Sequence, residues 1–383
     1  MSLVFVHGIG NRSGTDSYQE SVDLRSALFR RFLLTRALPD LAEARIFNPM
    51  WGDLGAHLRW QHSSLPRGSR ERLGADDRRL AELADVLGER SISELAHADL
   101  RDAVDLLYTV ADLRGRSAAE IEDLADLAAA LVDYCDTQQA TPAWLSESIG
   151  DEAMLDGLHR AGAVMQTDDR TERLGHRSTM GRLARDVLSA GIARYRRQQL
   201  GAPARLAAAG LRRLVAEPVS LLIGDVFCYL DSRGTKSAPG KIVQRVTADL
   251  DAARVDGPLV IVAHSMGGNI VYDILSSFRT DLEVDLLVTV GSQVGLFEEL
   301  SLFRASDRSI PNAAAPRVPA LPNVHKWINI VDRADVLAYR ADPIFAGPVD
   351  YEYPTDEPWA HTAYFRQPYF HQRLAARAKE ALT

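Results

Sequence analysis

Residues 263–268 read Ala-His-Ser-Met-Gly-Gly, and this stretch decides the fold. An apolar, β-branched run, Pro-Leu-Val-Ile-Val, precedes it at 258–262, and a helical pattern follows it at 269–275. A strand, a sharp turn with serine at its apex and then a helix form a nucleophile elbow. The strained turn needs small neighbours such as Gly267, and the helix N-terminus points free N–H groups at the turn. We therefore expect a reactive Ser265; the alternative is a serine in a tight turn without chemistry.

Composition indicates a globular chain. The 383 residues suffice for one large domain or two ordinary ones, and 46 % are hydrophobic and 25 % charged. The net charge of −8 argues against a nucleic-acid partner. Two cysteines far apart in sequence predict no disulfide framework, and no signal peptide precedes the apolar run that starts at Leu3, so we expect a cytoplasmic protein. Only four of the 44 basic residues are lysine, which together with abundant alanine is typical of GC-rich bacterial coding.

Short apolar runs alternate with helical patterns outside the middle of the chain. Strands are expected at 3–6, 44–48, 258–262, 284–290, 326–331 and 349–353. Helices are expected at 17–38, 240–254, 269–275 and 367–382, while 221–230 fits either helix or strand. Strands that alternate with helices predict an α/β fold with a mostly parallel sheet.

The middle of the chain, 53–217, has helical spacing and almost no strand signal. Acidic residues are dense in 76–156 and arginines in 182–213. If the helices of these two stretches pack together, their charges neutralise each other. If the arginines are exposed instead, they could bind an anionic membrane or a protein partner. A connection this long is normally a domain. We predict a core made of 1–52 and 218–383, with an all-helical cap inserted over the carboxyl ends of the strands.

An active Ser265 needs a histidine base, and that base needs a carboxylate to orient it. In chains with this elbow the acid and then the histidine follow the serine. Of the later histidines, His325 opens a strand before any plausible acid, and His371 lies in the last helical pattern. His361 lies in a loop after the last strand and is our candidate base.

The acid is expected just past a strand. Asp335 lies in the turn after 326–331 and is our candidate, while Asp332 at the strand end is the alternative. Asp342 precedes a proline and is interpreted as a turn residue.

Two backbone N–H groups should bind the developing oxyanion. Met266 directly follows the nucleophile and supplies one, and Ile9 is our choice for the other, with Gly8 or Gly10 as alternatives in the same turn. The histidines lack metal-ligand spacing, so we expect neither a metal ion nor a cofactor.

Phe5-Val-His-Gly-Ile-Gly-Asn11, together with 263–268, resembles serine esterases and lipases of the α/β-hydrolase superfamily. In that superfamily a turn follows the strand after the elbow, and residues 289–293 resemble it. Its acid loop resembles 327–336, and its histidine loop resembles 360–364. From this sequence we expect a core without the usual leading antiparallel strands, and the long helical segment has no counterpart in the resemblance.

The resemblance implies a serine hydrolase that cleaves carboxylic esters through an acyl-enzyme. A lipid or long-chain acyl ester is favoured because a large amphipathic cap suits apolar substrates. The same triad would serve an amidase, a peptidase or a thioesterase. A third hypothesis is an effector regulated by a partner, in which the helical insertion is the interaction module.

Overall fold

The computed structural model describes residues 2–14, 18–37, 44–60, 93, 96–97, 99–111, 113, 116–137, 142–146, 150–165, 186–188, 220–255, 257–357 and 360–382. Six strands form one sheet in the order β2-β1-β3-β4-β5-β6, and every neighbouring pair is parallel. Their bounds are β1 Ser2–Val6, β2 Arg45–Phe47, β3 Leu259–His264, β4 Leu286–Val290, β5 Trp327–Val331 and β6 Pro348–Glu352. The predicted α/β fold with a parallel sheet is confirmed, and each predicted strand is present.

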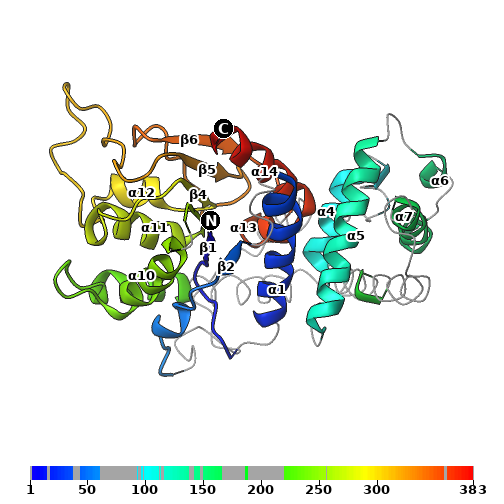
Figure 1. Ribbon diagram of the computed structural model, residues 1–383, viewed down its shortest axis with the longest axis horizontal. Coiled ribbons are helices and arrows are strands. Elements are labelled where there is room, and N and C mark those ends of the chain that lie inside the picture. Colours follow the sequence, from blue (N-terminus) through cyan, green and yellow to red (C-terminus); the bar gives the residue numbers. More distant parts are fainter. Residues whose placement is uncertain are drawn as a thin grey trace, which may run out of the picture.

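Two helical layers cover the sheet (Figure 1). One contains α1 Tyr18–Leu28, its π-helical continuation η1 Phe29–Ala37, and α14 Pro368–Leu382. The other contains α10 Lys241–Arg254, α11 Met266–Asp273 with η4 Ile274–Phe278, and α12 Val294–Glu299. Side chains alternate between the faces of a strand, so Leu3 and Phe5 pack under the first layer and Val4 and Val6 under the second. Both faces of the central strands are therefore buried from solvent.

Short helical turns and one longer helix complete the core. The turns are η3 Gly52–Leu54, α13 Ala360–Ala363 and η5 Tyr364–Arg366. Residues 220–232 are helical, which decides the segment that the sequence left open. Residues 55–60 are not helical, so the prediction of helix from residue 53 onward is wrong for that stretch. The glycine at 55 and the hydrogen bonds of 55–56 to core residues hold this stretch as a loop.

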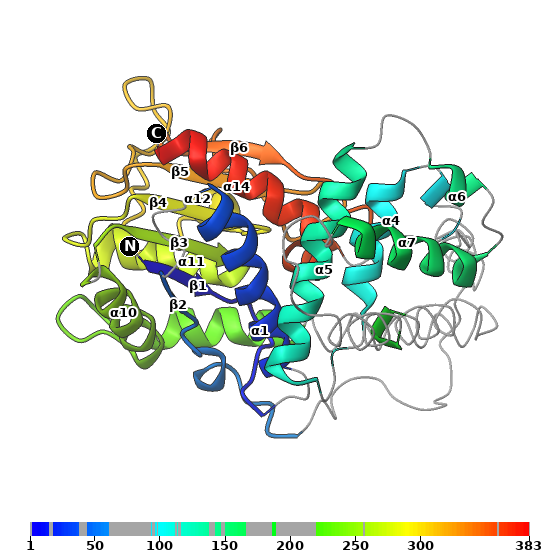
Figure 2. The ribbon, with the colours of Figure 1, turned by 45° about the vertical axis from the view of Figure 1, so that its right-hand side comes forward.

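The described helices of the middle segment lie beside α1 and α14, on the side to which the carboxyl ends of the strands point (Figure 2). They are α4 Leu100–Val110, α5 Ala118–Thr137, α6 Ala143–Ser146 and α7 Asp151–Met165. Their apolar side chains share one cluster with α1, η1 and α14. Of the arginine-rich stretch 182–213, only 186–188 are described, so its predicted binding surface lies outside the described residues. No described helix combines the length and apolarity needed to cross a bilayer.

A buried carboxylate joins α4 to the core. Asp105 accepts hydrogen bonds from the Tyr353 hydroxyl at 2.8 Å and from the Tyr369 N–H at 3.2 Å. Burial raises the pKa of Asp105 to about 7, and those two hydrogen bonds oppose the rise. Asp105 is thus protonated in the folded protein over a pH range in which an unfolded aspartate is ionised.

The raised pKa of Asp105 predicts a loss of stability as pH rises. A carboxyl whose pKa is higher in the folded state stabilises fully below about pH 4, its unfolded value, and that contribution is lost as pH rises through about 7. We expect Asp105→Asn to lose less unfolding free energy than wild type between pH 5 and pH 8, measured by urea denaturation. Asp156→Asn, an exposed change on α7, is the control and should behave as wild type. Equal pH dependence of Asp105→Asn and wild type would contradict the assignment.

Candidate active site

Ser265 stands at the turn between β3 and α11 with φ 54° and ψ −129°. The positive φ angle belongs to a backbone conformation that residues other than glycine rarely adopt. Its N–H donates to the Val290 carbonyl at 3.0 Å, and the Ser292 hydroxyl donates to its carbonyl at 3.0 Å. The sheet neighbour β4 and the turn after it therefore hold the strained residue in place.

Two glycines allow the close approach that the elbow requires. A Cβ on Gly8 would stand 2.7 Å from the Ser265 Cβ, and one on Gly267 would stand 2.3 Å from the Val6 carbonyl oxygen. Both distances are shorter than real Cβ contacts. The end of β1 and the start of α11 thus meet at backbone distance, with the serine between them.

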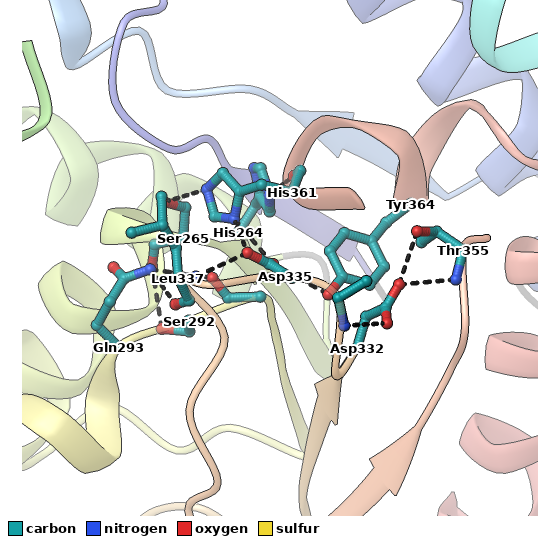
Figure 3. A network of polar contacts seen from close by, with 12 residues as sticks. His264, Ser265, Ser292, Gln293, Asp332, Asp335, Leu337, Thr355, His361 and Tyr364 are labelled. Atoms are coloured by element: carbon teal, nitrogen blue, oxygen red, sulfur yellow. Dashed lines mark hydrogen bonds and ion pairs between the residues drawn. The ribbon is translucent and has the colours of Figure 1, made fainter. Parts of the chain in front are cut away.

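The structure brings Ser265, His361 and Asp335 into one hydrogen-bonded chain (Figure 3). The Nε2 atom of His361 lies 2.8 Å from the Ser265 Oγ, and Nδ1 lies 2.9 Å and 3.0 Å from the two Asp335 carboxylate oxygens. A proton on Nδ1 donates to the carboxylate, which leaves Nε2 to accept the proton of the serine hydroxyl. Ser265 is fully buried, and the His361 side chain is 17 % exposed.

Other donors hold the carboxylate of Asp335. The Tyr364 hydroxyl donates to it at 3.0 Å and the Leu337 N–H at 2.9 Å. Burial first, and then the charge of Asp335, raise the pKa of Tyr364, so its hydroxyl stays a neutral donor. A Cβ on Gly291, where φ is +54°, would stand 2.8 Å from the same carboxylate. The turn after β4 therefore has room for the acid only because residue 291 is glycine.

Asp332, the alternative acid, has different partners (Figure 3). Its carboxylate accepts from the Thr355 N–H at 2.7 Å and hydroxyl at 2.6 Å, and from the Ala334 N–H at 2.8 Å. Thr355 lies on the segment that leads from β6 to His361. Asp332 thus fastens that segment to the end of β5, whereas Asp335 contacts the imidazole.

The other candidate histidines make hydrogen bonds elsewhere. His325 is exposed, with Nε2 3.1 Å from Glu283. His371 is buried in α14, with Nε2 3.0 Å from the Phe365 carbonyl. Asp342 pairs with Arg340 at the surface.

The two expected oxyanion donors lie on either side of the nucleophile. Met266 follows Ser265 in α11, and Ile9 follows Gly8, which touches the serine. Within the described part of the chain, neither backbone N–H has a hydrogen-bond acceptor. The Gly10 N–H instead donates to Asp225 at 3.2 Å, which excludes it as a free donor.

Sequence reasoning missed the anchor of the loop after β1. Asp225, in the helix 220–232, is fully buried and accepts from the Arg12 guanidinium at 2.8 Å and from the Ala56 N–H at 2.7 Å. Trp51 stacks on His7 at 5.0 Å between ring centroids and donates its indole N–H to the His7 carbonyl. Burial lowers the pKa of His7 to about 4, so it braces the loop as a neutral ring.

His264 contacts His361, the candidate base, through both its ring and a hydrogen bond. Its Nε2–H donates to the His361 carbonyl at 2.8 Å, and the two ring centroids are 4.8 Å apart. Burial, followed by the nearby His361, lowers the pKa of His264 well below its usual value, so the ring is neutral. The one sequence signal for this contact was its place next to Ser265.

The described residues contain no group of three or more His, Cys, Asp or Glu side chains suited to a metal ion. The reactive groups that the structure describes at this site include the serine hydroxyl, the imidazole and the carboxylate.

Comparison with known proteins gives one informative similarity. A protein named "Probable phospholipase YOR022C, mitochondrial" from Saccharomyces cerevisiae is 28 % identical over 148 residues. The aligned part is 35 % of this chain and 20 % of the yeast protein, so the chain matches about a fifth of that relative's length. No family model matches the chain, and neither does any solved structure. The similarity weakly supports a lipase-like hydrolase.

Gly267 gives a test of the elbow that needs no substrate. Gly267→Ala places a methyl group against the Val6 carbonyl, so we expect a loss of about 1–3 kcal/mol of unfolding free energy, as for other overpacked sites. The control is Gly14→Ala, where the added Cβ meets nothing within 4 Å. Urea denaturation of both variants is the measurement, and equal midpoints would show that the close approach is absent.

Proposed function

We propose that this chain is a serine hydrolase that cleaves a carboxylic ester of a lipid through an acyl-enzyme on Ser265. The observation that carries the proposal is the hydrogen-bonded chain from Ser265 through His361 to Asp335, at a strained strand-to-helix turn. The similarity to a probable phospholipase supports an ester of a lipid over an amide, a peptide or a thioester.

The mechanism follows from the positions of these atoms. The Ser265 Oγ attacks the ester carbonyl while His361 Nε2 takes the hydroxyl proton, and Asp335 stabilises the imidazolium that forms. The N–H groups of Met266 and Ile9 donate to the oxyanion. His361 then protonates the departing alcohol, which leaves an acyl group on Ser265. Water attacks that acyl group with His361 again as base, and the serine is restored.

The segment 53–217 completes the proposal as an inserted cap on a core made of 1–52 and 218–383. Supporting this, α4 packs near η5, which directly follows the helical turn that carries His361. An element in that position can shape the space in which an acyl chain lies.

Labelling with a fluorophosphonate probe tests the nucleophile. We expect wild type to be labelled and Ser265→Ala to stay unlabelled, with ester turnover reduced on the order of 10⁴-fold or more. Near wild-type turnover by the variant would overturn the proposal. Labelling that requires an added protein would instead favour the partner-regulated effector.

The two neighbouring aspartates give a matched pair. Asp335→Asn removes the charge beside the imidazole and should reduce kcat on the order of 10³ to 10⁴-fold with little change in melting temperature. Asp332→Asn weakens the hold on Thr355 and should cost about 1–3 kcal/mol of unfolding free energy while kcat changes far less. Steady-state kinetics and thermal melting of both variants are the measurements, and exchanged outcomes would assign the acid to Asp332.

A further inference from the structure

Arg25, on α1, is a partly buried cation that makes no ion pair with a described carboxylate, although the charge of Asp23 is close enough to act on it. Its guanidinium carbon lies 3.8 Å from the centre of the Phe5 ring, and one terminal nitrogen donates to the Asn48 side-chain oxygen at 2.8 Å. Its Nε–H is enclosed and has no acceptor. Within the described part of the chain, no carboxylate forms an ion pair with it.

Two other shielded arginines among the described residues are paired. Arg12 and Arg233 each lie 2.8 Å from a fully buried aspartate, Asp225 and Asp273 respectively. A shielded charge without a counter-ion is unfavourable, and an aromatic face and one amide oxygen offset only part of that cost. Burial lowers the pKa of Arg25 to about 10, so the guanidinium is still charged at neutral pH. An anion supplied from outside the chain would complete its environment.

Arg25 lies close to the site. Phe5, under the guanidinium, precedes His7 by two residues and packs on the same face of the sheet as α1. Phe365 connects Phe5 to the elbow, since the centre of its ring lies 4.8 Å from that of Phe5 and 5.3 Å from that of His264. The charge of Arg25 contributes to the lowered pKa values of both His7 and His264, whose neighbours are Gly8 and Ser265. Arg25 is intermediate in burial, so part of the residue is in contact with solvent.

We propose that Arg25 binds a phosphate group of the acyl substrate, beside the ester that Ser265 attacks. The inference rests on the proposed ester hydrolysis and names its substrate class, an acyl ester of a glycerol phosphate. A guanidinium matches phosphate because its planar N–H groups can donate in parallel to two oxygens. The phosphate supplies a counter-charge for Arg25. Because the phosphate and the ester belong to one small molecule, its binding also sets the distance between Arg25 and the ester carbonyl.

Two substrates with the same acyl chain test this kinetically: a 1-acylglycerol phosphate and the uncharged 1-acylglycerol, in the same detergent micelles. We expect Arg25→Gln to lower kcat/KM for the phosphate ester on the order of 10–100-fold, the usual range for a lost charged hydrogen bond. The uncharged ester should change less than about threefold. Arg25→Lys keeps the charge without the planar donors and should retain part of the preference.

Arg45→Gln is the matched control. Arg45 also lies over a phenyl ring, Phe47, at 4.6 Å, but it is exposed and pairs with Ser2 at the start of β1, away from the elbow. This variant should behave as wild type on both substrates. Equal losses on the two esters in Arg25→Gln, or the same selective loss in Arg45→Gln, would overturn the proposal.

A binding measurement separates this inference from the hydrolytic function. Calorimetry with glycerol 3-phosphate and with inorganic phosphate is carried out on Ser265→Ala and on the double variant that adds Arg25→Gln. We expect binding to Ser265→Ala and at least tenfold weaker binding to the double variant, with glycerol 3-phosphate the tighter ligand. Equal binding to both proteins overturns the phosphate site even if wild type hydrolyses esters. Arginine-dependent binding without hydrolysis of any ester by wild type would keep the phosphate site and reject the proposed activity.

Discussion

The backbone of Ser265 is held in the left-handed region because three chain segments meet there without room for side chains. Strand β3 delivers the serine, α11 leaves from it, and the loop after β1 crosses beside it at Gly8. Such a backbone costs on the order of 1–3 kcal/mol and persists only where its surroundings enforce it. Here the parallel pairing of β1 with β3 and of β3 with β4 enforces it. The same approach brings the loop with Gly8 and Ile9 against the residue that precedes Met266, so the strain and the proposed oxyanion donors have one origin.

Three buried aspartates surround this turn, and their partners separate their roles. Asp225 faces a guanidinium that is always charged, so its negative charge is balanced before any reaction begins. Asp332 faces an N–H and a hydroxyl of Thr355, which hold it as a structural acceptor. Asp335 faces the imidazole of His361, which gains a proton during the proposed reaction. Its charge is therefore the one whose stabilising effect grows toward the transition state, which is the requirement for catalysis.

Local patterns in the sequence predicted the strands, the elbow and the segment carrying His361, because alternation and turn residues act over a few positions. The choice between Asp332 and Asp335 depends on Thr355, which is 23 residues from Asp332 and has no pattern linking it to the turn. The anchor at Asp225 joins residues 213 positions apart. Residues 221–230 form an apolar run that suits a strand or a helix equally, and only packing decides between them. Long-range partnerships of buried polar groups are thus what the sequence alone could not supply.

The segment that carries His361 is held from two sides. On the core side, Asp332 accepts from Thr355. On the side of the middle helices, Asp105 accepts from Tyr353, and Arg366 donates to the Ala111 carbonyl at 2.6 Å. If the middle helices were removed, Tyr353 would lose its hydrogen bond to Asp105 and Arg366 its hydrogen bond to Ala111, and the apolar cluster shared with α1 and α14 would be opened to water. The position of the base therefore depends on the inserted helices as well as on the sheet, and the proposed cap and core form one structural unit around the imidazole.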